Sequence, residues 1–328
     1  MHKNLTFFSA KIFACFFVVC LHINFPGRIG QLITLFARFA VPLFFMITGY
    51  YTVCDDKNKM SEKIDKRLKK IVNLTLTSFI FYFILNILIN VKNGTMGNYI
   101  LQIKNYANIL KFLLLNWTTP VIGVGHIWYL FALVYILLIL KKVNKYNLYK
   151  KSYIVSILII VGIYIWELID SYYKLGVSQI YYRNAWLMGF SFFMLGHLMK
   201  VKEDKFLLSN KKLIIFSIIT ITSVLVLLCY EPKIINGDNC LYLFNILTNI
   251  FIFVIAINKN NISLFSRAGE LDSGNIYIIH YAIIILCGNT ISNFDGRFSP
   301  IYIFGISYLL SIFYRKIKTK YLKKLIKS

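Results

Sequence analysis

Residues 5–25 read LTFFSAKIFACFFVVCLHINF, an apolar run long enough to cross a bilayer that nevertheless contains a lysine and a histidine. Lys11 and His22 are eleven positions apart. At about 100° and about 1.5 Å per residue, a helix places their side chains within about 20° of one another and about 16 Å apart along its axis. Because an ammonium group and an imidazole are costly in hydrocarbon, a spanning helix that keeps both on one stripe usually uses them.

The composition places the whole chain in the membrane class. Of its 328 residues, 58% are hydrophobic and only 15% are charged. The mean hydropathy of +0.65 is far too high for a soluble domain. We predict an all-α polytopic membrane protein, one integral-membrane domain over residues 1–328 built as a bundle of about ten transmembrane helices. Strands are not expected, because the apolar runs are continuous rather than alternating. The predicted spans are 5–25, 29–54, 71–91, 126–141, 152–169, 183–200, 211–229, 241–258, 274–291 and 299–316.

The basic residues predict how these spans are oriented. With the N-terminus in the cytoplasm, 27 of the 37 lysines and arginines fall on the cytoplasmic side, eight fall outside, and Lys11 and Arg38 lie within spans. Such a positive-inside bias leaves both termini cytoplasmic. The net charge of +24 is then explained by topology signals that lie against an anionic inner leaflet. Membrane lipids are therefore expected partners, and nucleic acid is not.

Neither processing nor cysteine chemistry is expected to change this picture. Lys11 interrupts the apolar centre of the first span and no small-x-small cleavage site follows, so we expect that span to be retained. The six cysteines are scattered, with no CxxC pair and no His/Cys grouping at metal-ligand spacing, so no metal is predicted. Cys15 shares the stripe of Lys11 and His22, which leaves a thioester role open beside simple packing.

Polar residues within the predicted spans form two layers. Those near the outer face are His22, His126, Trp128, Glu167, Asp170 and Arg183; those nearer the cytoplasm are Lys11, His197 and His280, and Arg38 lies near the midplane. A set distributed from one face to the other indicates a polar path through the bundle. Polar residues at helix ends also serve as caps and interfacial anchors, and buried histidines often only hydrogen-bond to neighbouring helices. Lys11 and Arg38 lie more than a turn inside their runs, which favours a functional role for these two cations.

Five segments resemble motifs of the membrane-bound acyltransferase type 3 family, which includes bacterial surface-polysaccharide O-acetyltransferases. Lys11 and His22 resemble its R/K-x10-H signature. The other four segments are VPLFFMITGY (41–50), HIWYL (126–130), FMLGH (193–197) and IYIIH (276–280), which are similar to vPlFFmiSGy, hlWYL, ffllGy and iYliH. Two of them depart at one position, with Thr48 in place of Ser and His197 in place of Tyr. The resemblance runs in order from about residue 5 to residue 316.

This resemblance implies transfer of an acyl group, usually acetyl from cytoplasmic acetyl-CoA, to a hydroxyl of a glycan or lipid-linked glycan that faces the outside. It also implies a multi-pass protein of the bacterial plasma (inner) membrane. In the family, the histidine of the first span is regarded as catalytic and the basic residue as a donor-site contact. Carried over, these are His22 and Lys11. Lysine keeps the charge of the more frequent arginine but not its bidentate recognition of phosphate.

The residues themselves are consistent with such chemistry. A neutral imidazole at His22 is able to remove the proton of an acceptor hydroxyl as that hydroxyl attacks a thioester carbonyl. Lys11 and the basic segment 54–70 are expected to hold the donor phosphates, with Arg38 at the donor or at the developing oxyanion. Depth alone suggests Glu167 as the group that orients His22. The residues expected to bind the acceptor lie near the outer face and are His126, Trp128 and Arg183.

Two alternatives to an enzyme stay open at the level of the sequence. A transporter or flippase for a polysaccharide or lipid-linked sugar is the first, because a line of polar residues across a bundle also suits translocation. A non-catalytic scaffold for a glycan-assembly complex is the second. Acyl transfer predicts thioester chemistry that depends on His22, whereas a scaffold predicts that substitutions of Lys11 and His22 leave the pathway intact.

Overall fold

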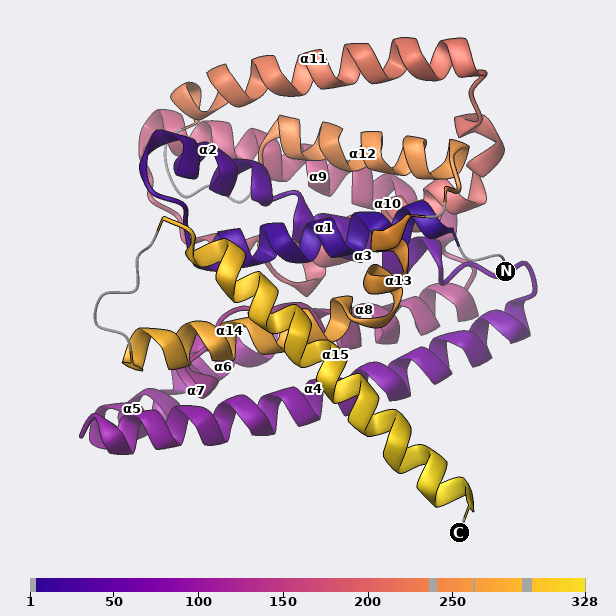
Figure 1. The fold of residues 1–328 in the computed structure, drawn as a ribbon. Helices are drawn as coiled ribbons and strands as arrows, with labels where there is room; N and C mark the ends of the chain where they lie inside the picture. Colours follow the sequence, from indigo (N-terminus) through magenta and orange to yellow (C-terminus); the bar gives the residue numbers. More distant parts are fainter. Residues whose placement is uncertain (1–3, 236–240, 262, 291–296, 328) are drawn as a thin grey trace. The chain divides into compact units, whose positions relative to one another are not determined.

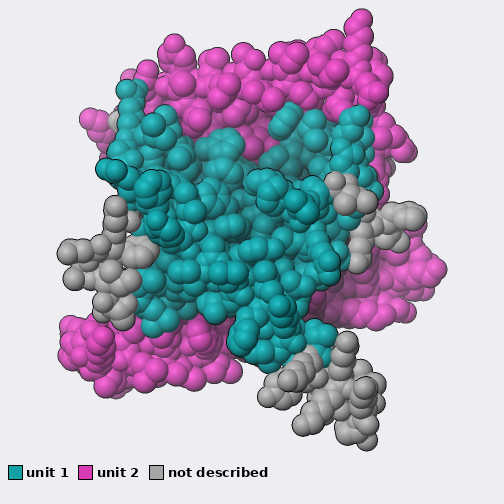
Figure 2. All heavy atoms as spheres, viewed as in Figure 1, with its two compact units in different colours: residues 1–40, 251–328 teal, residues 41–250 magenta. Residues whose placement is uncertain are grey.

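The computed structural model describes residues 4–235, 241–261, 263–290 and 297–327. Contacts within the chain divide it into two compact units, which Figure 2 distinguishes by colour. Unit 1 comprises residues 1–40 and 251–328, and unit 2 comprises residues 41–250. Unit 1 therefore combines the beginning of the chain with its C-terminal quarter, so residues far apart in the sequence meet within it.

All regular structure in the described residues is helical, and no strand occurs among them (Figure 1). The helices of unit 1 are α1 (Leu5–His22), α2 (Gly27–Ala37), α13 (Leu264–Leu271), α14 (Ser273–Thr290) and α15 (Ser299–Lys327). The α-helices of unit 2 are α4 (Lys57–Lys92), α5 (Met96–Lys104), α6 (Tyr106–Leu115), α7 (Thr119–Ile122), α8 (Trp128–Lys145), α9 (Tyr149–Tyr173), α10 (Phe190–Val201) and α11 (Asn210–Ile234). Unit 2 also contains the 3-10 helices η1 (Gln179–Tyr181) and η3 (Glu203–Phe206) and the π-helix η2 (Ala185–Gly189). The boundaries between the units fall within α3 (Ala40–Tyr50) and α12 (Leu243–Asn258). The all-α prediction is confirmed.

Each of the ten predicted apolar runs overlaps a helix of the structure. Among the described residues, five helical segments are long and apolar enough to cross a membrane, and a sixth is added if the bent pair α13 and α14 forms one span. These five are Leu5–His22, Gly27–Tyr50, Lys57–Lys92, Tyr149–Tyr173 and Asn210–Ile234. The chain is thus a multi-pass membrane protein. The number of ten spans and the cytoplasmic location of both termini stay predictions, and the last residue of the predicted run 274–291 lies outside the described residues.

Within unit 1, α1 packs against α2, α13, α14 and α15. Its contact with α13 is at backbone distance, because a Cβ added at Gly269 would lie 1.7 Å from the carbonyl oxygen of Phe8. Only glycine allows two helices to approach so closely. Further along α1, Val19 forms a buried apolar cluster with Ile283 of α14 and Ile303 of α15. The helix that carries Lys11 and His22 is therefore held by helices from the other end of the sequence.

The helices α13 and α14 meet at a bend of 73°. A capping box at Ser263 begins α13. The helix ends at Leu271, and the Asp272 backbone N–H donates to the Ala268 carbonyl over 2.8 Å before α14 starts at Ser273. Broken helices in membrane proteins often bring polar groups into the interior, where they line functional sites. Asp272, which lies at this bend, is therefore of interest for the site.

In unit 2, α3 and α10 pack at backbone contact. A Cβ at Gly49 would lie 2.0 Å from the carbonyl oxygen of Phe193, and a Cβ at Gly196 would lie 2.0 Å from that of Met46. Both glycines belong to motif segments, 41–50 and 193–197. The physical reason for glycine at these two positions is therefore the close packing of α3 on α10.

The segment between α4 and α8 folds into three short helices, α5, α6 and α7, which pack on one another. The apolar piece 109–117 overlaps α6. Asn116 ends α6 with a left-handed backbone (φ +60°), and its Oδ1 accepts a hydrogen bond of 3.0 Å from the Ala185 backbone N–H at the start of η2. This bond connects the short helices to the helix pair η2 and α10.

Candidate functional site

His22 ends α1, and its imidazole lies against α14. The ring centroid of His22 is 5.4 Å from that of His280, with 34° between the ring planes. It is 5.0 Å from the ring centroid of Tyr281, with the two planes nearly perpendicular at 89°. Two consecutive residues of α14 therefore contact the imidazole from different directions. His22 therefore faces α14, a neighbouring helix within unit 1.

The imidazole of His280 is fully buried. Its Nδ1 lies 3.1 Å from the carbonyl oxygen of Ile276, one turn earlier in α14. Because a carbonyl oxygen only accepts hydrogen bonds, Nδ1 is the nitrogen that carries the proton in this contact. In the neutral ring, the nitrogen with the lone pair is therefore Nε2.

Lys11 lies three turns before His22 on α1 and is half-buried. Its Nζ is 5.8 Å from the ring centroid of Phe8, the residue whose backbone contacts α13. One turn further on, the thiol of buried Cys15 donates to the Ser273 carbonyl at the start of α14, over 3.3 Å. This contact gives Cys15 a packing role that links α1 to α14, and it supports the packing interpretation over a thioester role.

Arg38 lies at the junction of α2 and α3. It is the C-cap residue of α2, and its backbone N–H donates to the Leu35 carbonyl over 3.4 Å. The sequence predicted Arg38 near the middle of a continuous run, and the structure shows that this run contains a break there. Phe17 of α1 packs against Phe36 and Phe39 on either side, with ring centroids 5.4 and 5.3 Å away. Arg38 thus belongs to unit 1, as do Lys11 and His22.

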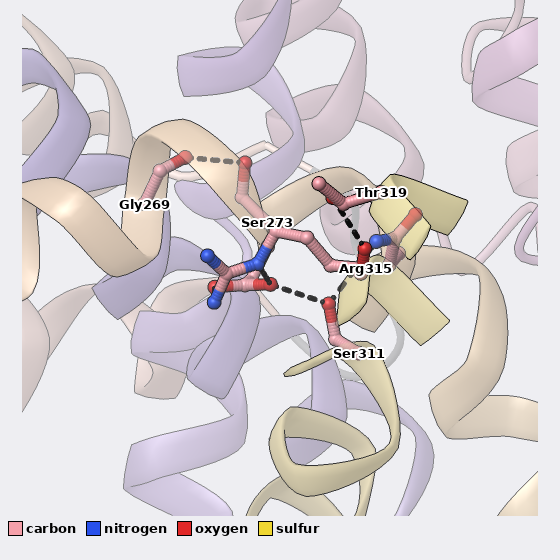
Figure 3. Close-up of polar contacts among 7 residues, drawn as sticks. Gly269, Ser273, Ser311, Arg315 and Thr319 are labelled. Atoms are coloured by element: carbon pink, nitrogen blue, oxygen red, sulfur yellow. Dashed lines mark hydrogen bonds and ion pairs between the residues drawn. The ribbon is translucent and has the colours of Figure 1, made fainter. Parts of the chain in front are cut away.

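An ion pair between the buried Asp272 carboxylate and the half-buried Arg315 lies at the bend between α13 and α14. The Asp272 carboxylate accepts hydrogen bonds from Nε and Nη2 of Arg315 on α15, over 3.1 and 3.2 Å, in the two-pronged geometry that arginine favours. The Ser311 hydroxyl donates to the same carboxylate over 2.8 Å, and Asn275 Nδ2 donates to Ser311 Oγ over 3.1 Å. Figure 3 shows the side chains of Arg315 and Ser311, and near them Ser273, whose hydroxyl donates to the Gly269 carbonyl.

Sequence reasoning missed this pair. Arg315 lies at the end of the predicted run 299–316, and Asp272 lies two residues before the run 274–291. The available signal was weak, because an acid just before one apolar run and a base at the end of the next are usual at membrane interfaces. The side chain of Asp272 is only 1% exposed, which distinguishes it from an interfacial anchor.

The residues predicted to bind the acceptor belong to unit 2. Two of them are neighbours, since the guanidinium of Arg183 lies 5.4 Å from the ring centroid of Trp128, the first residue of α8. The third, His126, is buried beside Tyr82 of α4, with perpendicular rings 4.9 Å apart. Arg183 covers the indole of Trp128, so any contact of a ligand with this pair begins at the guanidinium.

Glu167 also lies in unit 2, near the C-terminal end of α9. Its side chain is buried, and Oε1 accepts a hydrogen bond of 3.1 Å from the backbone N–H of Leu241, just before α12. Glu231 of α11 does the same for the first turn of α12, accepting from Leu243 N over 2.7 Å and from Phe244 N over 3.3 Å. These carboxylates stabilise the start of α12, where unpaired N–H groups favour negative charge. A role for Glu167 beside His22 stays a prediction.

The basic segment before the predicted span 71–91 is the first part of α4. It forms a hollow of about 310 Å³ whose lining residues are Lys59, Glu62, Lys63, Lys66, Arg67 and Lys70. Arg67 is partly committed to the fold, because its guanidinium donates to the carbonyls of Thr48 and Tyr51 over 3.1 and 2.8 Å and to Thr52 Oγ1 over 2.8 Å. The lysines on the same face of α4 are what make this hollow cationic.

His197 on α10 is part of unit 2 and has aromatic neighbours on α9. Its Nδ1 is 2.9 Å from the Tyr153 hydroxyl, and its ring stacks on Tyr149 at a centroid distance of 5.1 Å. The Tyr149 hydroxyl in turn donates to Asn144 Oδ1 over 2.9 Å. His197 therefore hydrogen-bonds a neighbouring helix, as the structural interpretation of this histidine predicted.

Nothing in the described part of the chain suggests a metal centre, because no group of three or more His, Cys, Asp or Glu is placed to hold an ion there. The five described cysteines, at positions 15, 20, 54, 229 and 287, are free thiols. The sixth, Cys240, lies outside the described residues.

The fold defines the class of protein: in the described residues it is a helical, multi-pass membrane protein. Its candidate site residues are His22 of α1, which contacts α14, and the cationic side chains on α1 and on α4. The sequence profile of the type 3 family described as an acyltransferase domain matches residues 9–314. The chain therefore belongs to the type 3 acyltransferase family, and its chemistry is acyl transfer. No curated protein and no solved structure matches the chain.

Proposed function

We propose that this protein transfers an acetyl group from cytoplasmic acetyl-CoA to a hydroxyl of an extracytoplasmic glycan or lipid-linked glycan, with His22 as the general base. The single observation that carries this proposal is the position of His22, whose ring packs against His280 and Tyr281 in a chain of the acyltransferase family. A histidine held by two neighbouring rings on another helix has a defined orientation, which general-base catalysis requires.

In this mechanism His22 removes the proton from the acceptor hydroxyl while the hydroxyl oxygen forms a bond to the thioester carbonyl carbon. The carbon–sulfur bond then breaks, and the ester product and a thiolate result. The imidazolium of His22 returns its proton to the thiolate, so the products are an ester and free CoA. Arg38, in the same unit as His22, is the proposed source of positive charge for the oxyanion of the tetrahedral intermediate.

For the donor phosphates, Lys11 is the proposed contact within unit 1, and the cationic hollow of α4 is the candidate site within unit 2. Lys59, Lys66 and Lys70 line that hollow, and Lys66 pairs with the well-exposed Glu62 at 3.9 Å. An exposed pair at this distance is weak, so a phosphate is able to compete for the lysine. The proposal places the negative part of the donor on these cations.

The acceptor is assigned to the Arg183 and Trp128 pair, with His126 nearby in sequence. A guanidinium over an indole offers hydrogen-bond donors to sugar hydroxyls and carboxylates, supported by an apolar ring beneath. Replacement of Arg183 by Met tests this assignment, because it keeps an apolar side chain over Trp128 but removes the donors. The expected result is a higher KM for the acceptor with an unchanged KM for acetyl-CoA.

The function is tested with the purified full chain in lipid nanodiscs and acetyl-CoA. The wild-type protein is expected to release free CoA thiol, by transfer to added glycan or by transfer to water, and His22→Ala is expected to lower the rate of that release by about 10²- to 10⁴-fold. Cys20→Ala is the matched control, since Cys20 is buried two residues earlier on the same helix and is not part of the site. Thiol release at the wild-type rate by His22→Ala would show that His22 is not the base. A wild-type protein that moves a lipid-linked sugar between leaflets without releasing thiol would favour the flippase alternative.

A further inference from the structure

His22 and His280 are separated by more than 250 residues in the sequence, yet their rings are neighbours in unit 1. Their centroid separation of 5.4 Å is about the length of one hydrogen bond plus the radii of two five-membered rings. The planes are tilted by only 34°, so the edges of the two rings are able to meet. At this centroid separation, two imidazoles whose nitrogens face one another are at hydrogen-bond distance.

The orientation of His280 is fixed by its own helix. Its Nδ1–H donates to the Ile276 carbonyl, and its ring is fully buried, so Nε2 is the nitrogen that accepts hydrogen bonds in the neutral ring. A base such as His22 needs one nitrogen free of a proton to receive the proton of the acceptor hydroxyl. Its other nitrogen then carries N–H and needs an acceptor to fix the tautomer.

We propose that His280 is the positioning residue for His22: its Nε2 accepts a hydrogen bond from the N–H of the His22 imidazole, which fixes the His22 tautomer and disperses the charge of the imidazolium. This inference rests on the proposed role of His22 as the base. It assigns to a neutral imidazole of α14 the part that sequence reasoning gave to Glu167. The pair neither gains nor loses a proton over the whole reaction, because the proton that His22 takes from the hydroxyl is returned to the thiolate.

Tyr281 has a different part in this arrangement. Its ring is perpendicular to that of His22 at 5.0 Å, the geometry of an aromatic edge-to-face contact. This contact restricts rotation of the His22 ring without determining which nitrogen carries the proton. Tyr281→Phe keeps the ring and is expected to keep the activity within about two-fold, because an edge-to-face contact depends on the ring itself.

Two isosteric substitutions separate the proposal from a purely structural role. The amide of glutamine reaches the place of Nε2, and the amide of asparagine reaches the place of Nδ1. His280→Gln therefore keeps an acceptor for His22, whereas His280→Asn keeps only the donor toward Ile276. With thiol release from acetyl-CoA as the readout, His280→Asn is expected to lower kcat by roughly 10- to 100-fold with KM for acetyl-CoA unchanged, and His280→Gln is expected to restore most of kcat.

The matched control is Cys287→Ala, which shortens a side chain on the same face of α14 two turns later, beside the apolar cluster of Val19 and Ile283. This variant and wild type are expected to have the same kcat. The thermal unfolding temperature of every variant is measured in the same nanodiscs. If His280→Asn does not fold, His280→Met replaces it, because methionine fills the buried site without an acceptor at the position of Nε2.

The outcomes distinguish this inference from the proposed function. A wild-type protein without thiol release, or a fully active His22→Ala, would refute the proposed function and this inference with it. An active wild type and an inactive His22→Ala, together with equal kcat values for the Gln and Asn variants of His280, would overturn this inference alone. The same holds if His280→Asn lowers the residual rate of His22→Ala as much as it lowers that of wild type, because a residue that acts through His22 has no effect once His22 is absent.

Discussion

The histidine on α14 and the histidine on α10 are both buried in helical surroundings, but they are used differently. In unit 2, Nδ1 of His197 meets the Tyr153 hydroxyl and the ring stacks on Tyr149, so the imidazole links α10 to α9. In unit 1, Nδ1 of His280 turns to a carbonyl of its own helix, and the ring faces His22. The contacts of His197 connect two helices, whereas the ring of His280 lies beside the imidazole of His22.

The role of a buried histidine is therefore better inferred from the partners of its two ring nitrogens than from its depth in the membrane. From depth alone, His197 and His280 were placed in the same layer near the cytoplasm. Their contacts separate them, since a bond to a neighbouring helix contributes stability and a fixed tautomer beside a candidate base contributes to catalysis. The predictions below test this separation.

Removal of the His22 imidazole is expected to have the largest effect. General bases typically contribute about 10²- to 10⁴-fold, so His22→Ala is expected to lower the rate of thiol release from acetyl-CoA by that factor. The stability of the chain is expected to change little, because His22 is the last residue of α1 and is only partly buried. Stopped assays at saturating acetyl-CoA measure the rate. A loss of folded protein in proportion to the loss of rate would contradict the separation of catalysis from stability at this position.

The second largest effect is expected on stability, from loss of the ion pair between Asp272 and Arg315. Arg315→Ala leaves the buried carboxylate of Asp272 without its cation, and because the Arg315 side chain is 33% exposed the expected cost is below the roughly 3–5 kcal/mol of a fully buried pair. The thermal unfolding temperature of the full chain is expected to fall. Asp272→Asn together with Arg315→Gln removes both charges and is the control, because the two amides and Ser311 are still able to hydrogen-bond. If the double variant is as unstable as Arg315→Ala, the instability of Arg315→Ala does not come from the unpaired charge of Asp272.

Substitutions of Lys11 test whether its ammonium group binds the acyl donor. If its ammonium contacts the donor, Lys11→Ala removes one charge-assisted contact of about 1.5–3 kcal/mol, which raises KM for acetyl-CoA by roughly 10- to 150-fold. Lys11→Arg keeps the charge and is expected to keep much of the activity. Expression of Lys11→Ala is not expected to fall, because the substitution removes a charge from an apolar helix. An unchanged KM with a lower saturated rate would instead place Lys11 at the chemical step.

The smallest effect is expected in unit 2. Tyr153→Phe removes the hydroxyl that meets Nδ1 of His197 and is expected to lower the free energy of unfolding by about 0.5–1.5 kcal/mol. The kcat for thiol release is expected to stay at the wild-type value. Unfolding in denaturant and the thiol assay measure the two quantities on the same preparation. A large loss of kcat in this variant would mean that the histidine of α10 also serves the reaction.

Much of the fold could be predicted from the sequence because it depends on local properties. Long apolar runs have to be helical in a bilayer, where backbone groups have no water to bond to, and each of the ten predicted runs overlaps a helix. The break at Arg38 and the bend at Asp272 were not predicted. Both have a local signal in the sequence: Pro42 follows Arg38 by four residues and is unable to donate a helical hydrogen bond to the Arg38 carbonyl, and the turn residues Asp272-Ser273-Gly274-Asn275 lie at the bend.

The sequence by itself determined the membrane class, the helical periodicity that aligns Lys11 with His22, and the motifs of the acyltransferase family that the profile match confirmed. Only the tertiary structure decided that His280 and Tyr281 contact His22 and that Arg315 holds Asp272. The physical reason is that the faces of an apolar helix look alike in sequence, since lipid and protein neighbours are equally apolar. Which face meets which helix is decided by close packing, such as that of Gly269 on Phe8, and by buried polar pairs between residues distant in the chain.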